Sequence, residues 1–138
     1  MASFSFVASG NIQPSRFVVL SGVRQVAQAG DNGEILGVSQ EGSNRAPLQD
    51  LVGTVYAAQA GESLLVYSAG EMCLVEAGAA ITAGQLLKSD AQGRAVPVAA
   101  TGATIQNYGA IALEAAAAAG EKVLVLVTPL QKVRPALT

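Results

Sequence analysis

The side chains best equipped for chemistry in this sequence are three glutamates, Glu62, Glu71 and Glu76. Each falls near the end of an expected strand, and neighbouring strands could bring paired carboxylates together for acid–base work. Glutamates at strand ends are far more often solvated groups that do no chemistry. Sugar hydrolases also need aromatic platforms, and aromatic residues make up only 4% of this chain, with no tryptophan. We therefore expect no catalytic residues. The alternative, an enzyme using carboxylates alone, would gather the three glutamates around a deep pocket.

Other reactive side chains are scarce. The chain has no histidine, which removes Ser-His-Asp and Cys-His nucleophilic systems and the commonest zinc ligand. The single cysteine, Cys73, lies in an apolar run at 72–75, where a buried, inert thiol is expected. The segment Gly30-Asp31-Asn32-Gly33 lacks the later oxygen ligands of a calcium loop and is expected to be a turn. We expect no metal and no cofactor.

The charge of the chain also limits its partners. Charged residues make up 13% of the 138 residues, against about 25% in an average domain, and the formal net charge is −2. Because there is no basic field, we expect no binding to nucleic acid. No apolar run approaches the roughly 20 residues of a membrane helix. Residues 1–7 do not resemble a signal peptide, so we expect synthesis in the cytoplasm and no membrane partner.

Fifteen glycines separate short apolar runs, a pattern typical of an all-β sandwich or barrel. The expected strands are Arg16–Leu20, Gln25–Ala29, Ile35–Gln40, Leu64–Ser68, Met72–Glu76, Gln85–Ser89, Ala95–Val98, Tyr108–Leu113 and Lys122–Thr128. Residues 90–93, Asp-Ala-Gln-Gly, are expected to form a turn.

Two of these strands carry further expectations. Lys122–Thr128 is almost entirely apolar at its centre, so we expect it to be central and buried on both faces. In Tyr108–Leu113, Ala110 and Ala112 share one flat face, which suits close approach of another sheet or another subunit. The alanines at 115–119 that follow are expected to form a loop, with a short helix as the alternative.

The two ends differ from the middle of the chain. Residues 1–15 are expected to form an N-terminal arm, residues 16–128 a single β-domain, and residues 129–138 a C-terminal tail. Neither end has an obvious core partner within itself, and such arms are either disordered or ordered by a neighbour. We expect residues 1–15 to be ordered mainly by contact with a neighbouring molecule, whereas for residues 129–138 a solvated tail is an open alternative. The polar stretch 41–49 is expected to be an exposed loop.

The order of several short segments resembles a family of tailed-bacteriophage capsid decoration, or cement, proteins. The similarity covers roughly residues 12–128. Its elements are Ile12-Gln13-Pro14-Ser15-Arg16-Phe17-Val18, then Ile35-Leu36-Gly37-Val38-Ser39-Gln40, then the segment 77–87 with Ser89-Asp90 and Gly93-Arg94-Ala95, and finally 109–116 with Gly120-Glu121.

The resemblance implies a compact jelly-roll or β-tulip-like sandwich or barrel with extended terminal arms. It implies a virion structural protein that binds the outer surface of the capsid and cements neighbouring major capsid protein subunits against internal DNA pressure. Its place would be the outer capsid surface, after synthesis in the host cytoplasm. It implies a homo-oligomer, for which the two arms and the alanine face favour a dimer, with a trimer as the alternative. The candidate contacts to the shell or to another subunit are Phe4, Phe6, Ile12, Lys132 and Arg134.

A second hypothesis remains open. The chain could be an adhesive or glycan-binding β-module of a virion tail fibre or surface structure. Binding to glycans in solution would favour this hypothesis, and the low aromatic content argues against it.

Overall fold

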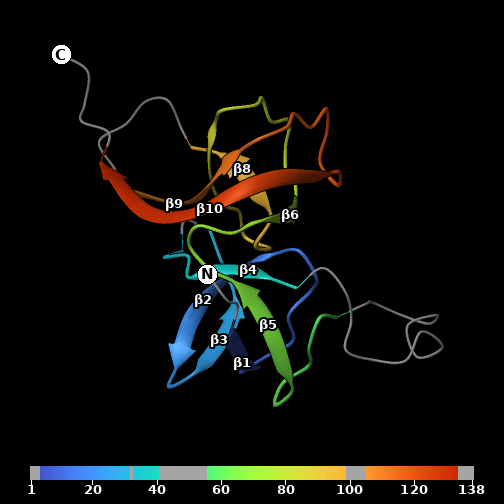
Figure 1. The fold of residues 1–138 in the computed structure, drawn as a ribbon, viewed down its shortest axis with the longest axis vertical. Coiled ribbons are helices and arrows are strands. Elements are labelled where there is room, and N and C mark those ends of the chain that lie inside the picture. The colour runs from blue at the N-terminus through green and yellow to red at the C-terminus, as the bar shows by residue number, and fades with distance from the viewer. Residues whose placement is uncertain (1–3, 32, 41–55, 99–104, 134–138) are drawn as a thin grey trace.

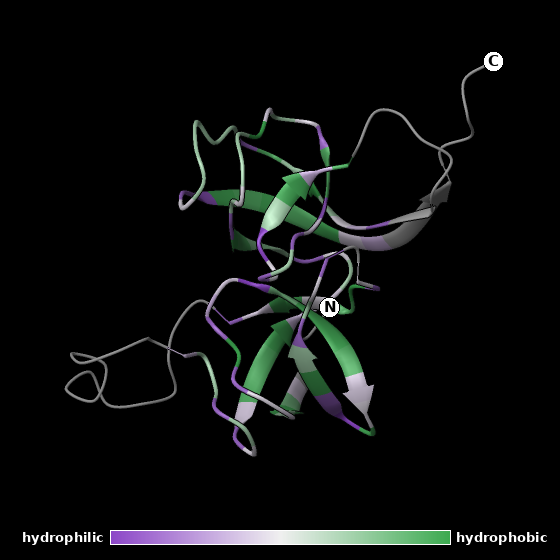
Figure 2. Ribbon diagram, turned by 180° about the vertical axis from the view of Figure 1, so that it is seen from behind, coloured by the Kyte–Doolittle hydropathy of each residue, from purple (hydrophilic) through white to green (hydrophobic). Residues whose placement is uncertain are grey.

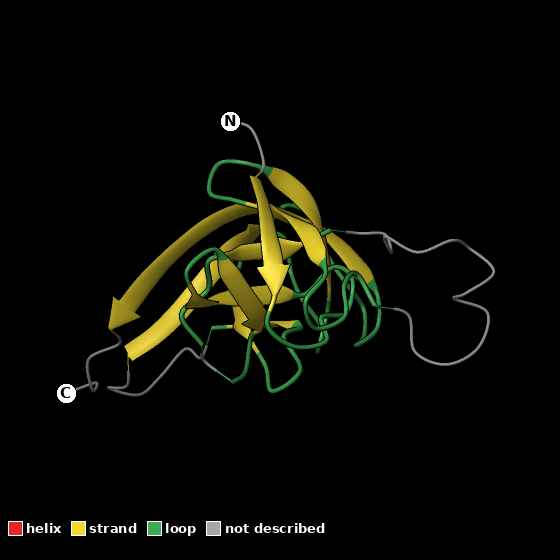
Figure 3. Cartoon of the chain, turned by 90° about the horizontal axis from the view of Figure 1, so that it is seen from below, coloured by secondary structure: helices red, strands yellow, loops and turns green. Residues whose placement is uncertain are grey.

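The structure of the chain is a computed structural model that describes residues 4–31, 33–40, 56–98 and 105–133. These ranges contain ten strands and no helix, so none that could cross a membrane (Figure 3). The strands are β1 (Phe4–Ala8), β2 (Phe17–Gly22), β3 (Gln25–Gln28), β4 (Gly37–Ser39), β5 (Ser63–Tyr67), β6 (Met72–Glu76), β7 (Leu86–Ser89), β8 (Ala95–Pro97), β9 (Ile105–Ala112) and β10 (Lys122–Val133). The all-β class is therefore confirmed.

The first five strands form a closed barrel in the order β1-β3-β2-β4-β5, seen in the lower half of Figure 1. Strand β1 closes it by pairing parallel with β3 and antiparallel with β5. Closure leaves no free strand edge that could pair with other chains. The interior is filled by small and branched apolar side chains, chiefly Ile12, Val18, Val26, Leu64 and Val66.

The last five strands form a sheet in the order β6-β10-β9-β7-β8. A parallel bridge between Ala77 and Ala95 brings its two edges together at one point. Strand β10 is central, as expected. Its burial alternates, however: Val123, Val125 and Val127 are buried, whereas Leu124 and Leu126 remain partly exposed. The expectation that both faces are buried is wrong, because among the described residues the shared core covers the valine face of β10 and leaves the leucine face partly exposed.

The barrel and the sheet share a second core. Phe17 and Val18 are adjacent in β2 and point to opposite sides, as successive strand residues must. Val18 lies inside the barrel, whereas Phe17 packs with Ile35 and Val38 against the valines of β10. Strand β2 is therefore apolar on both faces because each face meets a different layer.

All nine expected strands are confirmed, and β1 is the addition. The structure differs here from the expected N-terminal arm, because Phe6 and Ala8 lie on the same face of β1 and pack in the core of the chain's own barrel. The expected tail also begins later, since β10 continues to Val133 and pairs there with Ile105 of β9. The expected loop at 41–49 lies outside the described residues.

The alanine-rich segments behave differently from one another. The loop at 115–119 is confirmed, with Ala116 bridging to Ile81. Ala110 and Ala112 are fully buried in the shared core, so their face meets the chain's own core and is covered there. The expectation that the face of Ala110 and Ala112 could contact another subunit is therefore wrong. Gly109 marks a close approach of β9 to the barrel side, since a Cβ there would lie 2.6 Å from Ile35 Cδ1.

Candidate functional site

Two of the three candidate glutamates hold tight turns together. Glu62 accepts a hydrogen bond through Oε1 from the backbone N–H of Gln59 (2.7 Å), and Glu71 does the same for Ser68 (2.8 Å). In each case the glutamate N–H donates back to the carbonyl of the same partner. Gln85 makes the identical pair of bonds with Thr82, so the turn needs an acceptor oxygen and not a charge. These contacts give Glu62 and Glu71 a local structural role.

No metal site is formed among the described residues, since no three His, Cys, Asp or Glu side chains there lie close enough to hold an ion. Cys73 is buried in the shared core, as expected. The expected turn at 30–33 is present, with the Gly33 N–H donating to the carbonyl of Gly30 (3.1 Å). Asn32 itself lies outside the described residues.

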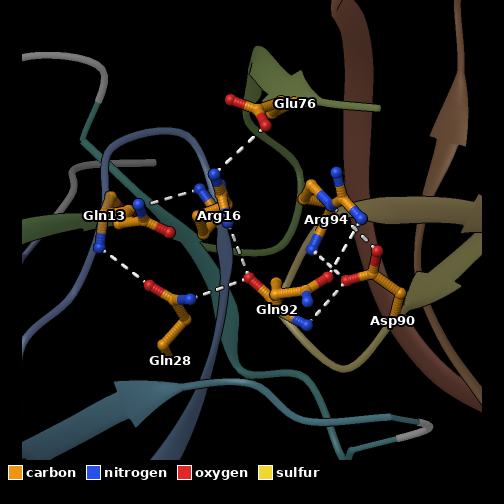
Figure 4. A network of polar contacts seen from close by, with 8 residues as sticks. Gln13, Arg16, Gln28, Glu76, Asp90, Gln92 and Arg94 are labelled. Carbon is orange, nitrogen blue, oxygen red and sulfur yellow. Dashed lines mark hydrogen bonds and ion pairs between the residues drawn. The ribbon is translucent and has the colours of Figure 1, made fainter. Parts of the chain in front are cut away.

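The third glutamate belongs to a polar junction between the barrel and the sheet. Arg16 precedes β2 and its side chain is 9% exposed. Its Nη2 lies 3.1 Å from Oε2 of Glu76 at the end of β6, and its Nη1 donates to the carbonyl of Gln92 (2.8 Å). Gln28 of β3 donates to the same carbonyl (2.8 Å), as Figure 4 shows. One backbone oxygen in the β7–β8 turn thus receives two side chains from the barrel.

The β7–β8 turn is ordered by its own charged pair. Asp90 Oδ1 accepts the backbone N–H groups of Gln92 (2.8 Å) and Arg94 (2.9 Å). Oδ2 receives Nε of Arg94 at 3.0 Å. Gly93 in this turn accepts the backbone N–H of Phe17 through its carbonyl (2.8 Å). The turn expected at 90–93 is therefore one of the elements by which the sheet attaches to the barrel.

Two of the five candidate contact residues, Phe6 and Ile12, meet in the core of the barrel. Phe6 is half-buried and packs against the barrel core. Ile12 is fully buried in that core, so it lacks the exposure that contact with a partner requires. Phe4 begins β1 with its backbone opposite Val66, and Lys132 lies opposite Gln106 in the extension of β10. Arg134 lies outside the described residues.

A surface that sequence reasoning did not single out lies on the outer face of the sheet. We define the outer face by six aliphatic residues on β6, β9 and β10 and the residue that follows β9: Met72, Leu74, Ile111, Leu113, Leu124 and Leu126. Met72 is 64% exposed and Leu113 is 41% exposed. Figure 2 shows hydrophobic colouring along these strands. The signal in the sequence was the lack of alternation in 72–75 and 123–127. It was interpreted as burial of Cys73 in the first run and as burial on both faces in the second.

Comparison with known proteins agrees with this architecture. The family model described as "phage cement protein" matches residues 2–127. No curated protein sequence matches the chain. Among solved structures, the head fibre gp8.5 N base of bacteriophage phi29 superposes with a TM-score of 0.59 at 21% identity, over 92% of this chain and 93% of that one. At this identity the likeness establishes a shared fold.

Proposed function

The chain belongs to the phage cement protein family, and from that premise we propose that it binds the outer capsid surface and cements neighbouring major capsid protein subunits against DNA pressure. The broader role, that of a structural protein of the phage virion, follows from membership of the family. No enzymatic step forms part of the proposal.

The observation that supports the finer role is the joint between barrel and sheet. A cement protein must touch at least two neighbouring shell subunits and resist their separation, so its own contact areas must be rigidly connected. The shared core and the Arg16–Glu76–Gln92 contacts connect the two layers through both apolar packing and charge-assisted hydrogen bonds. A body of this kind transmits load between its contacts, and repeated copies over a lattice add their effects.

Association into a homo-oligomer is part of the proposal, with a dimer favoured and a trimer as the alternative. The two features that favoured a dimer in the sequence no longer support it, because Phe4–Ala8 and the alanine face are used within the chain.

Shells of the parent phage assembled without this protein provide the test. Purified protein is added to DNA-filled shells, occupancy is measured by co-sedimentation, and DNA release is followed during heating. We expect saturable binding and a higher release temperature than in shells without added protein. Saturable binding with an unchanged release temperature would contradict cementing, and absence of binding would contradict the proposal as a whole. Sedimentation with host cells or their glycans instead of shells would favour the adhesive alternative.

A further inference from the structure

The hairpin formed by β2 and β3 carries two exposed aliphatic side chains at the end of the barrel away from the sheet (Figure 1). Val23, in the turn itself, is 93% exposed, and Leu20 near the end of β2 is 60% exposed. Figure 2 shows hydrophobic colouring at this turn. Phe17 and Val18 at the start of β2 are fully buried and serve the fold, whereas Leu20 and Val23 add little to either core. We call Leu20 and Val23 the apolar tip.

The same turn is strained at Arg24. Its φ is 55°, in the left-handed region, where the Cβ of an L-residue is sterically unfavourable. Elsewhere in the described chain, glycine occupies positive φ at five positions: Gly61, Gly70, Gly84, Gly93 and Gly120. Arg24 is exposed, and its guanidinium forms no hydrogen bond or ion pair with a described residue, so no contact within the chain offsets the strain. Strain of this kind is typical of positions where the side chain has a function.

The hairpin is held firmly in spite of its exposure. The backbone N–H of Val7 in β1 donates to the Arg24 carbonyl (2.9 Å), and Gln25 pairs with Val7 in the parallel ladder. The Oγ atoms of Ser9 and Ser21 lie 2.7 Å apart. Because the turn is fixed on a closed barrel, a partner that binds it would immobilise few additional groups, which favours binding.

The charge beside the apolar tip indicates the chemistry of the partner. In the described part of the barrel, Arg24 is the one exposed cation, and the exposed acids Asp31 and Glu34 lie outside the hairpin. Protein interfaces commonly combine an apolar centre with a polar rim of complementary charge. We propose that the β2–β3 hairpin inserts into an apolar depression with an acidic rim on the shell protein. This inference rests on the proposed binding to the capsid and assigns one of its contacts.

Other classes of partner fit the hairpin less well. Attachment to a lipid surface uses several cations together with aromatic side chains, and residues 20–25 contain one cation and no aromatic residue. A nucleic acid backbone would require several cations to neutralise its phosphates. Two aliphatic side chains beside one cation match a small, desolvated contact between proteins.

The apolar tip is tested by co-sedimentation with shells of the parent phage assembled without this protein. Val23→Ser and Leu20→Ser should each weaken binding at least about tenfold, because each removes an aliphatic side chain that the contact would bury. Leu65→Ser is the matched control, since Leu65 is 48% exposed on β5, which pairs with neither β2 nor β3. It should bind as the wild type does. Circular dichroism and thermal unfolding establish that each variant is folded.

The cation is tested by the rate of association with immobilised shells. Arg24→Glu should slow association about tenfold at low ionic strength, and the difference should shrink as added salt screens the charges. Arg24→Lys keeps the charge and should stay within about threefold of the wild type. Arg24→Gly removes the cation and relieves the backbone strain, so it should weaken binding without lowering the unfolding temperature. Damage to the fold would not produce that combination.

A photocrosslink identifies the protein that the hairpin touches. Cys73 is buried, so the thiol introduced by Val23→Cys is the accessible one for attachment of benzophenone maleimide. Illumination on shells should crosslink this labelled variant to the major capsid protein. Leu65→Cys, labelled in the same way, should give no such product.

Several outcomes would overturn the inference and leave the shell-binding function standing. They are wild-type binding by both serine variants of the tip, an unchanged association rate in Arg24→Glu, or crosslinks confined to other copies of this chain. Flotation with vesicles of phosphatidylcholine and phosphatidylserine that is lost in Val23→Ser would overturn it in favour of a lipid surface. Absence of binding by the wild type would contradict the proposed function and the inference together.

Discussion

Arg16 and Glu76 stand 60 residues apart in the chain and are 3.1 Å apart in the structure, where they connect the barrel to the sheet. The pair is largely shielded from water, with side-chain exposures of 9% and 22%. Arg16 also donates to the carbonyl of Gln92, so that one side chain contacts two separate parts of the sheet unit. Its planar guanidinium makes this double contact possible, whereas a lysine ammonium would supply one point charge.

Removal of the Arg16 guanidinium should therefore be costly. We expect Arg16→Met to lower the free energy of unfolding by about 3 kcal/mol, because Glu76 would remain partly buried without its partner. Arg94→Met is the matched control, since the Arg94–Asp90 pair lies within a single hairpin and the Arg94 side chain is 28% exposed. Asp90 would keep its two backbone N–H donors, so the change should cost about 1 kcal/mol or less. Urea unfolding followed by circular dichroism measures both. Equal losses would show that the junction has no special role.

The glutamates of the tight turns should tolerate neutralisation. Gln85 performs the same capping role as Glu71 without a charge, so Glu71→Gln should change the unfolding free energy by less than about 0.5 kcal/mol. Glu71→Ala removes the acceptor from the Ser68 N–H and should cost about 1 kcal/mol. Thermal unfolding distinguishes the two variants. A large loss in Glu71→Gln would mean that the carboxylate has a function that the turn does not explain.

Local patterns predicted most of the strands and the position of β10, because strand periodicity and turn residues act over a few residues. For the apolar runs of β2 and β10, the correct interpretation depended on which parts of the chain cover each face of the strand. An apolar run indicates that neither face of a strand carries charged side chains. In β2 both faces are covered by layers of the same chain. In β10 the same kind of run has one face covered and the other left partly exposed. Local sequence cannot distinguish these cases, since the covering layers come from distant parts of the chain.

Local sequence was equally unable to predict the contacts between charged residues in the polar junction. The segments containing Arg16 and Asp90 were noticed through their resemblance to a family, and Glu76 was considered only as a possible acid or base. Nothing in the spacing of Arg16 and Glu76 indicates that they meet, because the contact arises only when the sheet docks on the barrel. Strand β1 was missed for a related reason, since its two partners, β3 and β5, become neighbours only when the barrel closes.

The close approach of β9 to the barrel side provides a test of the shared core. A Cβ at Gly109 would lie 2.6 Å from Ile35 Cδ1 and 3.0 Å from its Cβ. Gly109→Ala should therefore destabilise the fold by about 2 kcal/mol through overpacking. Gly10→Ala is the control, because no atom lies within 4 Å of a Cβ built there, and it should be nearly neutral.

A double-mutant cycle identifies the clash. Ile35→Ala alone should cost about 2–4 kcal/mol by creating a cavity. In Gly109→Ala with Ile35→Ala, the added methyl group enters that cavity, so the combined loss should be smaller than the sum of the single losses. Denaturant unfolding of the four proteins gives the coupling energy. Strict additivity would contradict direct packing between Gly109 and Ile35.

Ser15 combines two unfavourable features whose removal should stabilise the chain. Its φ is 56°, in the left-handed region, and its buried Oγ has no hydrogen-bond partner among the described residues. Ser15→Gly removes the steric cost and the unpaired hydroxyl together, for an expected gain of about 1–2 kcal/mol after the extra entropy of glycine in the unfolded chain. Arg24→Gly is the matched control, because Arg24 has a φ of 55° but is exposed, so only backbone strain is relieved there. We expect its gain to be under about 1 kcal/mol. Thermal and urea unfolding would measure both, and a Ser15→Gly protein less stable than the wild type would show that the hydroxyl contributes an interaction that outweighs the strain.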